Sequence, residues 1–383
     1  MNTPPARRRQ LRTLAPVAGQ ECLRAVTSDQ EPGPELLDLA SNDYQSLCRH
    51  PLVIAAAQRE LHCSGVGAGG SRLVSGSRPI HARLETALAS WLGRQRVLLF
   101  PSGFQANLAA VRALADRRTT VLADRLVHHS LLVGVQASGA RLRRFPHNDL
   151  DALEQLLLGC RKDRPDAPLL IITESLFSME GTSPDVNRLA ALCQRHGARL
   201  LLDEAHALGV LGVGGRGLGF GDERVTMLSG TLGKAFGSGG AFLACDAELG
   251  DALLQGSGAF RYTTALAPPL AAAALAALEL IQANPAWGPT LVQRSRQWRD
   301  RLVSVGWPRP MGEGPILPLL VGDDQACLDL QHRLELSGLL TVAIRPPTVP
   351  EGSARLRLVL HRRLPDGTLD ALLQALADDA VSR

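Results

Sequence analysis

Hydrophobic residues along the chain follow two alternating patterns. Short, nearly continuous apolar runs occur at 97–100, 120–123, 169–173, 200–202 and 225–228. Between these runs lie segments whose apolar residues recur every three to four positions, as on one face of a helix. Buried strands that alternate with amphipathic helices predict an α/β fold, with a mostly parallel central sheet flanked by helices on both faces.

The two ends of the chain depart from this pattern. Residues 1–42 are polar and rich in proline, so they predict an N-terminal arm. Residues 43–279 contain the alternating strands and helices and predict one large domain. Beyond them strands and helices alternate again over shorter segments, which predicts a smaller α+β C-terminal domain over 280–383.

Composition narrows the functional classes. The 383 residues carry a net charge of +4 that is spread along the chain, which argues against nucleic acid or an anionic membrane as a partner. The seven cysteines are scattered without CxxC spacing, so we expect no disulfides, no metal site and a reducing, cytoplasmic location. No apolar segment is long enough to cross a bilayer.

One lysine stands out because lysine is nearly absent. Only two of the 41 basic residues are lysines, Lys162 and Lys234. Lys162 lies in RKDRPD, which is typical of a solvent-exposed loop. Lys234 lies among glycines between two apolar runs, 225–228 and 240–245, a pattern that predicts strand, tight turn and strand. An amine can lose its proton and attack a carbonyl, so Lys234 is a candidate nucleophile; the alternative is an exposed turn lysine.

Polar residues follow several predicted strands, at the ends where ligands of an open α/β sheet collect. The run 97–100 ends in PSGF before a helix, whose free N–H groups suit a phosphate or form an ordinary cap. The run 200–202 ends in Asp203, with His206 three residues later. This pair could hold a ring from two sides, or Asp203 could pair with an arginine.

Two matches to nucleotide-binding motifs fail on their context. The glycines of 65–70 fit GxGxxG, but they follow a predicted helix where the motif needs a strand. Residues 203–206 spell DEAH, the acidic box of a helicase class, which also needs the phosphate loop GxxxxGK[ST]. The one Gly-Lys pair, Gly233-Lys234, is followed by alanine, so we do not expect ATP hydrolysis.

Seven motifs together are similar to those of the α-oxoamine synthases, pyridoxal 5'-phosphate enzymes of fold type I, over nearly the whole chain. The motifs are SNDY (41–44), GAGGSRLVSG (67–76), PSGFQAN (101–107), ADRLVHHSLL (123–132), ESLFSMEG (174–181), LLDEAHALGVLG (201–212) and TLGKAFG (231–237). The resemblance implies a cofactor-dependent acyltransferase. A further segment, 343–358, favours the branch that joins L-alanine to a pimeloyl thioester of coenzyme A or acyl carrier protein in biotin biosynthesis. The alternative is a branch that uses glycine or serine with another acyl-CoA.

The resemblance also implies roles for individual residues. Lys234 would bond to the cofactor aldehyde and then remove the Cα proton. Asp203 would hold the proton on the ring nitrogen, and His128, chosen over His129, would stack on the ring and help position the acyl carbonyl. The other implied cofactor contacts are Gly103, Phe104 and Thr231 at the phosphate, Thr263 or Thr264 at the phosphate of a second subunit, and His206 and Ser178 at the ring hydroxyl.

The substrate contacts implied by the resemblance lie nearer the chain ends. Arg357 would bind the amino-acid carboxylate. Asn42, Arg12 and Thr348 would lie near the substrates. Strand alternation in ARLRLVL places Arg355 on the same face as Arg357, so alternation alone does not choose between them. The resemblance further implies a homodimer with active sites at the subunit interface.

Overall fold

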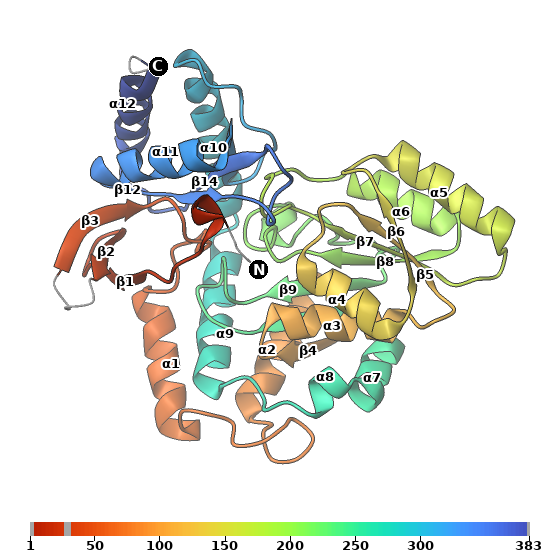
Figure 1. Cartoon of the computed structure of the whole chain (residues 1–383). Helices are drawn as coiled ribbons and strands as arrows, with labels where there is room; N and C mark the ends of the chain where they lie inside the picture. Colours follow the sequence, from red (N-terminus) through yellow and green to blue (C-terminus); the bar gives the residue numbers. More distant parts are fainter. Residues whose placement is uncertain (1–3, 27–31, 381–383) are drawn as a thin grey trace. The chain divides into compact units, whose positions relative to one another are not determined.

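A computed structural model describes residues 4–26 and 32–380, which divide into two compact units (Figure 1). The central unit comprises Gln45–Phe177 and Ser183–Pro289. The terminal unit comprises the described residues up to Tyr44, together with Ser178–Thr182 and the chain from Thr290 onward. The N-terminal segment and the C-terminal segment therefore belong to the same compact unit. The functional division at 42/43 and 279/280 stays a prediction.

The central unit is built on a seven-stranded sheet in the order β4-β10-β9-β8-β7-β5-β6. Only β10 is reversed, because it pairs antiparallel with both β4 and β9 while the remaining neighbours pair in parallel. The predicted mostly parallel sheet is confirmed. The strands are β4 (Arg96–Phe100), β5 (Thr120–Asp124), β6 (Arg141–Phe145), β7 (Leu169–Glu174), β8 (Ala198–Asp203), β9 (Met227–Thr231) and β10 (Ala241–Cys245).

Helices cover both faces of this sheet, as the sequence predicts. Successive strand residues enter opposite hydrophobic clusters: in β7, Ile171 enters one, and Leu170 and Ile172 enter the other. The first cluster includes α1 (Pro51–Ser64), α2 (Pro79–Leu92), α5 (Leu150–Asp163), α6 (Val186–Arg195) and α9 (Pro268–Ala283). The second includes α3 (Gly103–Leu114), α4 (His129–Ser138), α7 (Ala247–Gly256) and α8 (Gly258–Arg261).

The strand expected at 225–228 lies further along the chain, at Met227–Thr231. The small residues Ser229 and Gly230 suggested a turn in the sequence, but they belong to the strand because neighbouring side chains pack closely against them. Ser229 Oγ donates to Asn107 Oδ1 at 2.6 Å, and a Cβ at Gly230 would lie 2.3 Å from Phe242 Cζ. The two-strand pattern around Lys234 is confirmed, because β9 and β10 pair antiparallel.

The terminal unit contains two small sheets. The four-stranded sheet has the order β1-β2-β3-β12 and the three-stranded sheet has the order β11-β14-β13. Residues expected as an arm thus form three strands, of which β3 pairs in parallel with the C-terminal β12. The elements are η1 (Pro5–Arg7), β1 (Thr13–Pro16), β2 (Cys22–Val26), β3 (Pro32–Asp38), α10 (Trp287–Ser304), β11 (Ile316–Gly322), α11 (Asp324–Leu336), β12 (Leu339–Leu340), β13 (Val342–Ile344), β14 (Ala354–Val359) and α12 (Thr368–Ala380).

A fully buried arginine organises one segment of the terminal unit. Arg299 on α10 has no exposed surface, and none of its hydrogen-bond partners is a carboxylate. Burial lowers its pKa to about 10, so the side chain remains a cation at neutral pH. Its acceptors are Ser295 Oγ and the carbonyl oxygens of Ser295, Pro310, Met311, Gly314 and Ile316.

A fully buried glutamate fixes the chain after β8 in the central unit. Glu204 accepts hydrogen bonds from the backbone N–H groups of Leu218, at 3.2 Å, and Gly219, at 2.7 Å. Loss of water raises the pKa of Glu204 to about 7, and the two backbone bonds oppose this rise.

The Glu204 carboxyl should make the protein less stable at alkaline pH. The folded chain holds this proton more tightly than the unfolded chain, so the associated stability is complete below the ordinary glutamate pKa of 4.5 and is lost as pH rises through about 7. The loss is on the order of 3 kcal/mol. We expect the free energy of unfolding in urea to fall less between pH 5 and 8 in Glu204→Gln than in the wild type. Exposed Glu223→Gln is the control; an unchanged slope in Glu204→Gln would contradict this expectation.

Candidate active site

A cavity of about 180 Å³ lies in the central unit, where β8 and β9 end and α3 and α4 begin. Seven of the predicted cofactor-binding residues line this cavity, although they lie up to 131 positions apart in the sequence. The lining residues are Gly103, Phe104, Asn107, His128, Glu174, Asp203, Ala205, His206, Ser229, Gly230, Thr231 and Lys234.

One wall of the cavity is the N-terminus of α3. Ser102 caps this helix by accepting a hydrogen bond from the backbone N–H of Gln105, at 3.3 Å. Gly103 and Phe104 are the first two helical residues, so their N–H groups have no acceptor within the helix. Thr231, at the end of β9, adds a hydroxyl. These groups, at the positive end of a helix, suit a phosphate.

A buried carboxylate lies at the end of β8. Asp203 is 5% exposed, and its Oδ2 accepts from Asn107 Nδ2 at 2.8 Å while its Oδ1 accepts from Ala205 N at 2.9 Å. Asn107 is fixed in turn, because its Oδ1 accepts from Ser229 Oγ. These bonds orient the carboxyl group in the cavity, as a partner for a ring nitrogen must be oriented.

The same amide connects Asp203 to the histidine of the cavity. Asn107 Nδ2 also donates to Ser130 Oγ at 2.9 Å, and Ser130 Oγ lies 2.7 Å from His128 Nδ1. His128 Nδ1 accepts from the Ser130 backbone N–H at 3.3 Å, so the neutral ring carries its proton on Nε2. Loss of water lowers the pKa of His128; Asp203 opposes this shift and Lys234 adds to it.

Two residues of this site escaped the sequence analysis. Asn107 lies on a helix that was predicted from its apolar residues. The one signal in the sequence was an amide side chain within that helix, and the structure shows that this amide is buried. Glu174 is the last residue of β7, and its Oε1 accepts from the backbone N–H of His128 at 2.5 Å. His128 lines the cavity and His129 does not.

Lys234 is presented by the compact connection between β9 and β10. Gly237 N donates to the carbonyl oxygen of Lys234 at 2.8 Å and closes a turn. Gly237 has a φ of +60°, and a Cβ there would lie 2.2 Å from Cys48 N, so only glycine fits. The other lysine, Lys162, lies exposed in the last turn of α5 and not in the expected loop.

Three predicted residues near the cofactor lie outside this cavity lining. Ser178 belongs to the terminal unit. Thr263 Oγ1 accepts from Gln105 Nε2 at 3.2 Å, and Thr264 forms an isolated bridge with Ser71. The two threonines therefore lie beside the start of α3 and the glycine-rich loop, and their predicted contact with a second subunit stays a prediction.

The terminal unit distinguishes the two arginines of β14, which the sequence did not. Arg355 pairs with Glu180 Oε1 at 3.2 Å. Arg357 donates to Asn42 Oδ1 at 2.8 Å and to the carbonyl oxygen of Ser178 at 2.5 Å. Within the described ranges no carboxylate pairs with Arg357, so its charge is available for a substrate carboxylate.

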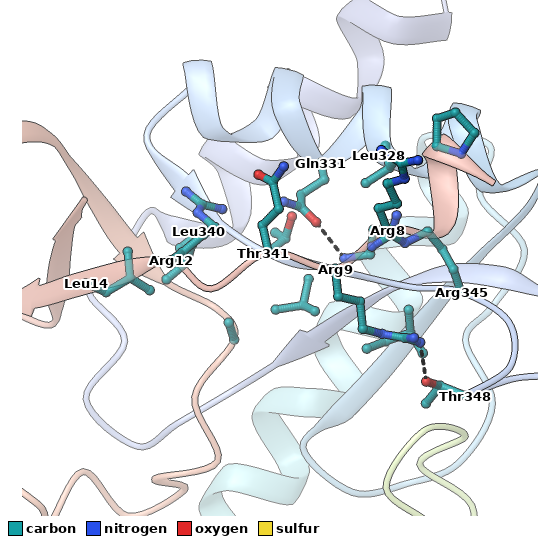
Figure 2. A pocket seen from close by; sticks show the side chains of 16 residues that line it. Arg8, Arg9, Arg12, Leu14, Leu328, Gln331, Leu340, Thr341, Arg345 and Thr348 are labelled. Atoms are coloured by element: carbon teal, nitrogen blue, oxygen red, sulfur yellow. Dashed lines mark hydrogen bonds between the residues drawn. The ribbon is translucent and has the colours of Figure 1, made fainter. Parts of the chain in front are cut away.

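Arg12 and Thr348 lie elsewhere in the terminal unit, on the lining of a second cavity of about 560 Å³ (Figure 2). Arg12 pairs with Glu335 at 2.5 Å, and Thr348 Oγ1 accepts from Arg9 at 2.9 Å. In the part of the chain that the structure describes, no three His, Cys, Asp or Glu side chains gather as a metal-binding group. None of the described helices has the length and apolar character needed to cross a membrane.

Known proteins resemble the chain in sequence and in fold. The family model for aminotransferase class I and II matches residues 34–376. The 8-amino-7-oxononanoate synthase of Chromohalobacter salexigens is 44% identical, covering 92% of this chain and 91% of that protein. The protein of the same name from Nitrosomonas europaea is 42% identical, covering 90% of each.

Solved structures with the same fold carry related names. A serine palmitoyltransferase from S. paucimobilis with a bound PLP–myriocin aldimine superposes with a TM-score of 0.87 at 25% identity, covering 94% of this chain and 90% of that one. An 8-amino-7-oxononanoate synthase from Francisella tularensis superposes with a TM-score of 0.76 at 27% identity, covering 91% and 98%.

Proposed function

Because this chain belongs to the aminotransferase class I and II family, and within it to the 8-amino-7-oxononanoate synthases, we propose that it condenses L-alanine with a pimeloyl thioester. The products are 8-amino-7-oxononanoate, carbon dioxide and the free thiol, in biotin biosynthesis. The enzyme is a pyridoxal 5'-phosphate-dependent acyltransferase with the fold of type I enzymes. The observation that carries the proposal is that Lys234, Asp203 and the start of α3 line one cavity.

The residues of this cavity fit the cofactor. Gly103, Phe104 and Thr231 would hold the phosphate, and Asp203 would hold the proton on the ring nitrogen. Pyridoxal 5'-phosphate supplies a cationic ring that withdraws electrons from the carbon next to the substrate nitrogen. Two hydrogen bonds, from Asn107 and from the backbone of Ala205, orient Asp203 for this purpose.

Two side chains of the cavity would move or position protons. Lys234 takes the proton from Cα of L-alanine and returns one to the product, because its amine is the base that the cavity presents at the end of β9. His128 is neutral and carries its proton on Nε2, so it donates a hydrogen bond to the acyl carbonyl. This bond stabilises negative charge on the carbonyl oxygen as the new carbon–carbon bond forms.

Exposed apolar side chains support a homodimer. Val66, Val74 and Tyr262 are each at least 79% exposed, and Phe104 at the start of α3 is 44% exposed. Large apolar side chains that are exposed to this extent are typical of a covered interface. Thr264, bridged to the glycine-rich loop, would then reach the phosphate of the second subunit. All seven cysteines are free, which supports the proposed cytoplasmic location.

A second candidate function is a related synthase that uses serine or glycine, which the serine palmitoyltransferase structures favour. The visible absorption of the purified holoenzyme separates the two candidates. We expect the band to shift with L-alanine at far lower concentration than with glycine or serine. Pimeloyl-CoA should then release carbon dioxide and 8-amino-7-oxononanoate, identified by mass spectrometry. A preferential response to glycine or serine would favour the second candidate.

Replacing Arg357 with lysine should raise the KM for L-alanine by about a hundredfold, because an ammonium group cannot form the paired bonds that a guanidinium makes with a carboxylate. Steady-state kinetics over a range of L-alanine concentrations measure this effect. Arg355→Lys is the matched control: it lies two residues away on the same strand and retains a cation beside Glu180. Equal changes in KM in the two variants would contradict the assignment.

A further inference from the structure

Five polar side chains of the central unit form one continuous series of hydrogen bonds, through Ser229, Asn107, Asp203, Ser130 and His128. They come from β9, α3, β8, α4 and the residue that caps α4. All except His128 are at most 5% exposed, so water does not compete for these bonds and each group depends on its neighbours. The proposed function uses Asp203 and His128 but assigns no role to the other three side chains.

The orientation of the Asn107 amide is fixed from two sides. Its Oδ1 accepts from Ser229 Oγ at 2.6 Å, and its Nδ2 donates to Asp203 Oδ2 at 2.8 Å. Turning the amide over would place Oδ1 against a carboxyl oxygen of Asp203 and would exchange a hydrogen bond for a contact between two acceptors. The amide therefore keeps its NH₂ group toward Asp203, and the second hydrogen of this group is donated to Ser130 Oγ at 2.9 Å.

This orientation determines what the Ser130 hydroxyl can do. Its oxygen accepts from Asn107, and its own hydrogen is then available for His128 Nδ1, which lies 2.7 Å away. The backbone N–H of Ser130 also donates to Nδ1, but at the longer distance of 3.3 Å. Two donors at Nδ1 oppose a proton on that nitrogen, so the neutral ring carries its hydrogen on Nε2.

The charges around His128 do not choose between its two nitrogens. Loss of water has the largest effect and lowers the pKa of His128; Asp203 opposes this shift, and Lys234 and His129 add to it. These effects favour the neutral ring as a whole. The nitrogen that carries the hydrogen is therefore decided by the bonds from Ser130.

We propose that Asn107 and Ser130 are positioning residues that hold His128 in the form with its one ring proton on Nε2, and that the Asp203 carboxyl group sets this arrangement through them. Their role rests on the proposed function, in which this Nε2–H group donates to the acyl carbonyl. One carboxyl group then serves both substrates: it faces the ring nitrogen of the cofactor that holds L-alanine, and it prepares the histidine for the acyl donor.

A proton on Nδ1 of His128 would be harmful in either form that carries one. In the other neutral tautomer, Nε2 has no hydrogen and would present a lone pair to the acyl carbonyl oxygen, which repels it. In the imidazolium form, a positive charge would lie beside the cationic ring of the cofactor and beside Lys234. Both forms should slow the acyl step and leave the binding of L-alanine almost unchanged.

The direct test is NMR of the full-length holoenzyme with ¹⁵N-labelled histidine, in which the signals of His128 are assigned by their loss in His128→Asn. In the wild type at neutral pH, Nε2 should carry the proton and Nδ1 should carry none. In Ser130→Ala a measurable fraction of Nδ1 should be protonated, because only the 3.3 Å backbone bond remains there. Ser138→Ala, on the same helix with its hydroxyl bonded to the carbonyl oxygen of Val135, is the control and should match the wild type.

A kinetic comparison tests whether the effect passes through Asn107. We expect Ser130→Ala to lower kcat/KM for pimeloyl-CoA about fivefold, while the L-alanine concentration that half-shifts the absorption band stays within about twofold. The same substitution in an Asn107→Leu background should cost less than about twofold, because Ser130 has already lost the donor that orients it. A full fivefold loss in that background would exclude Asn107 from the series.

The NMR result stands apart from the proposed function, because it reports on the ring of His128 and not on turnover. A wild type with its proton on Nδ1 would overturn the positioning role even if none of the variants folds. Equal protonation of Nδ1 in the wild type and Ser130→Ala would overturn it as well. If the wild type in either case responds to L-alanine and releases 8-amino-7-oxononanoate, only the positioning role is refuted and the proposed function remains.

Discussion

Replacement of Lys234 by alanine should lower kcat at least about a thousandfold, because no other lysine amine lines the cavity. The cofactor should still bind through its phosphate, since Gly103, Phe104 and Thr231 are unchanged. Its absorption band should lie at the position of the free aldehyde and should respond slowly to L-alanine. Turnover is measured by release of 8-amino-7-oxononanoate and carbon dioxide.

The chain provides an unusually clean control for this experiment. Lys162 is the only other lysine, and it lies exposed at the end of α5. Lys162→Ala should retain wild-type turnover. After borohydride reduction of the holoenzyme, mass spectrometry should find the cofactor on the peptide that contains Lys234 and not on the one that contains Lys162. Normal turnover in Lys234→Ala would refute the proposed chemistry.

Replacement of Asp203 by asparagine should lower kcat about a thousandfold, for an electrostatic reason. The carboxylate accepts two hydrogen bonds, from Asn107 and Ala205, and retains the negative charge that holds a proton on the ring nitrogen. An asparagine side chain can accept only with its oxygen, so its NH₂ group would face one of these donors. The variant loses the charge and one of the two bonds.

The Asp203→Asn variant is tested by kcat and by the absorption band of the bound cofactor as a function of pH. The band should indicate an unprotonated ring nitrogen over the range in which the wild type is protonated. Asp185→Asn, an exposed N-cap of α6, is the control, since it should affect stability slightly and kcat not at all. A kcat within tenfold of the wild type would rule out this role for Asp203.

The hydrophobic pattern predicts those strands that are buried on both faces. In β7 all six residues are buried, so a continuous apolar run identifies it. In β6 the sequence RLRRF carries three arginines because the strand lies at the edge of the sheet, and no apolar run marks it. Strands β1 to β3 likewise escape prediction, because backbone pairing and not burial defines them.

The residues of the candidate site likewise fall into those that the sequence predicts and those that it does not. Lys234 and Asp203 could be proposed from residue type and position, since both follow a buried strand. The choice between Arg355 and Arg357 could not, because it depends on Glu180, which lies 175 positions from Arg355. Asn107 matters through bonds to residues distant in the chain, and no local pattern reveals such bonds.

The carbonyl cage around Arg299 has a consequence for how the terminal unit holds its shape. Five backbone carbonyl oxygens converge on this guanidinium, an arrangement that many proteins build around a calcium ion. Here the cation is covalently part of α10. The carbonyl oxygens therefore always have their cation, whatever the concentration of ions or chelators in solution. The segment Pro310–Ile316 is held in place without a bound metal ion.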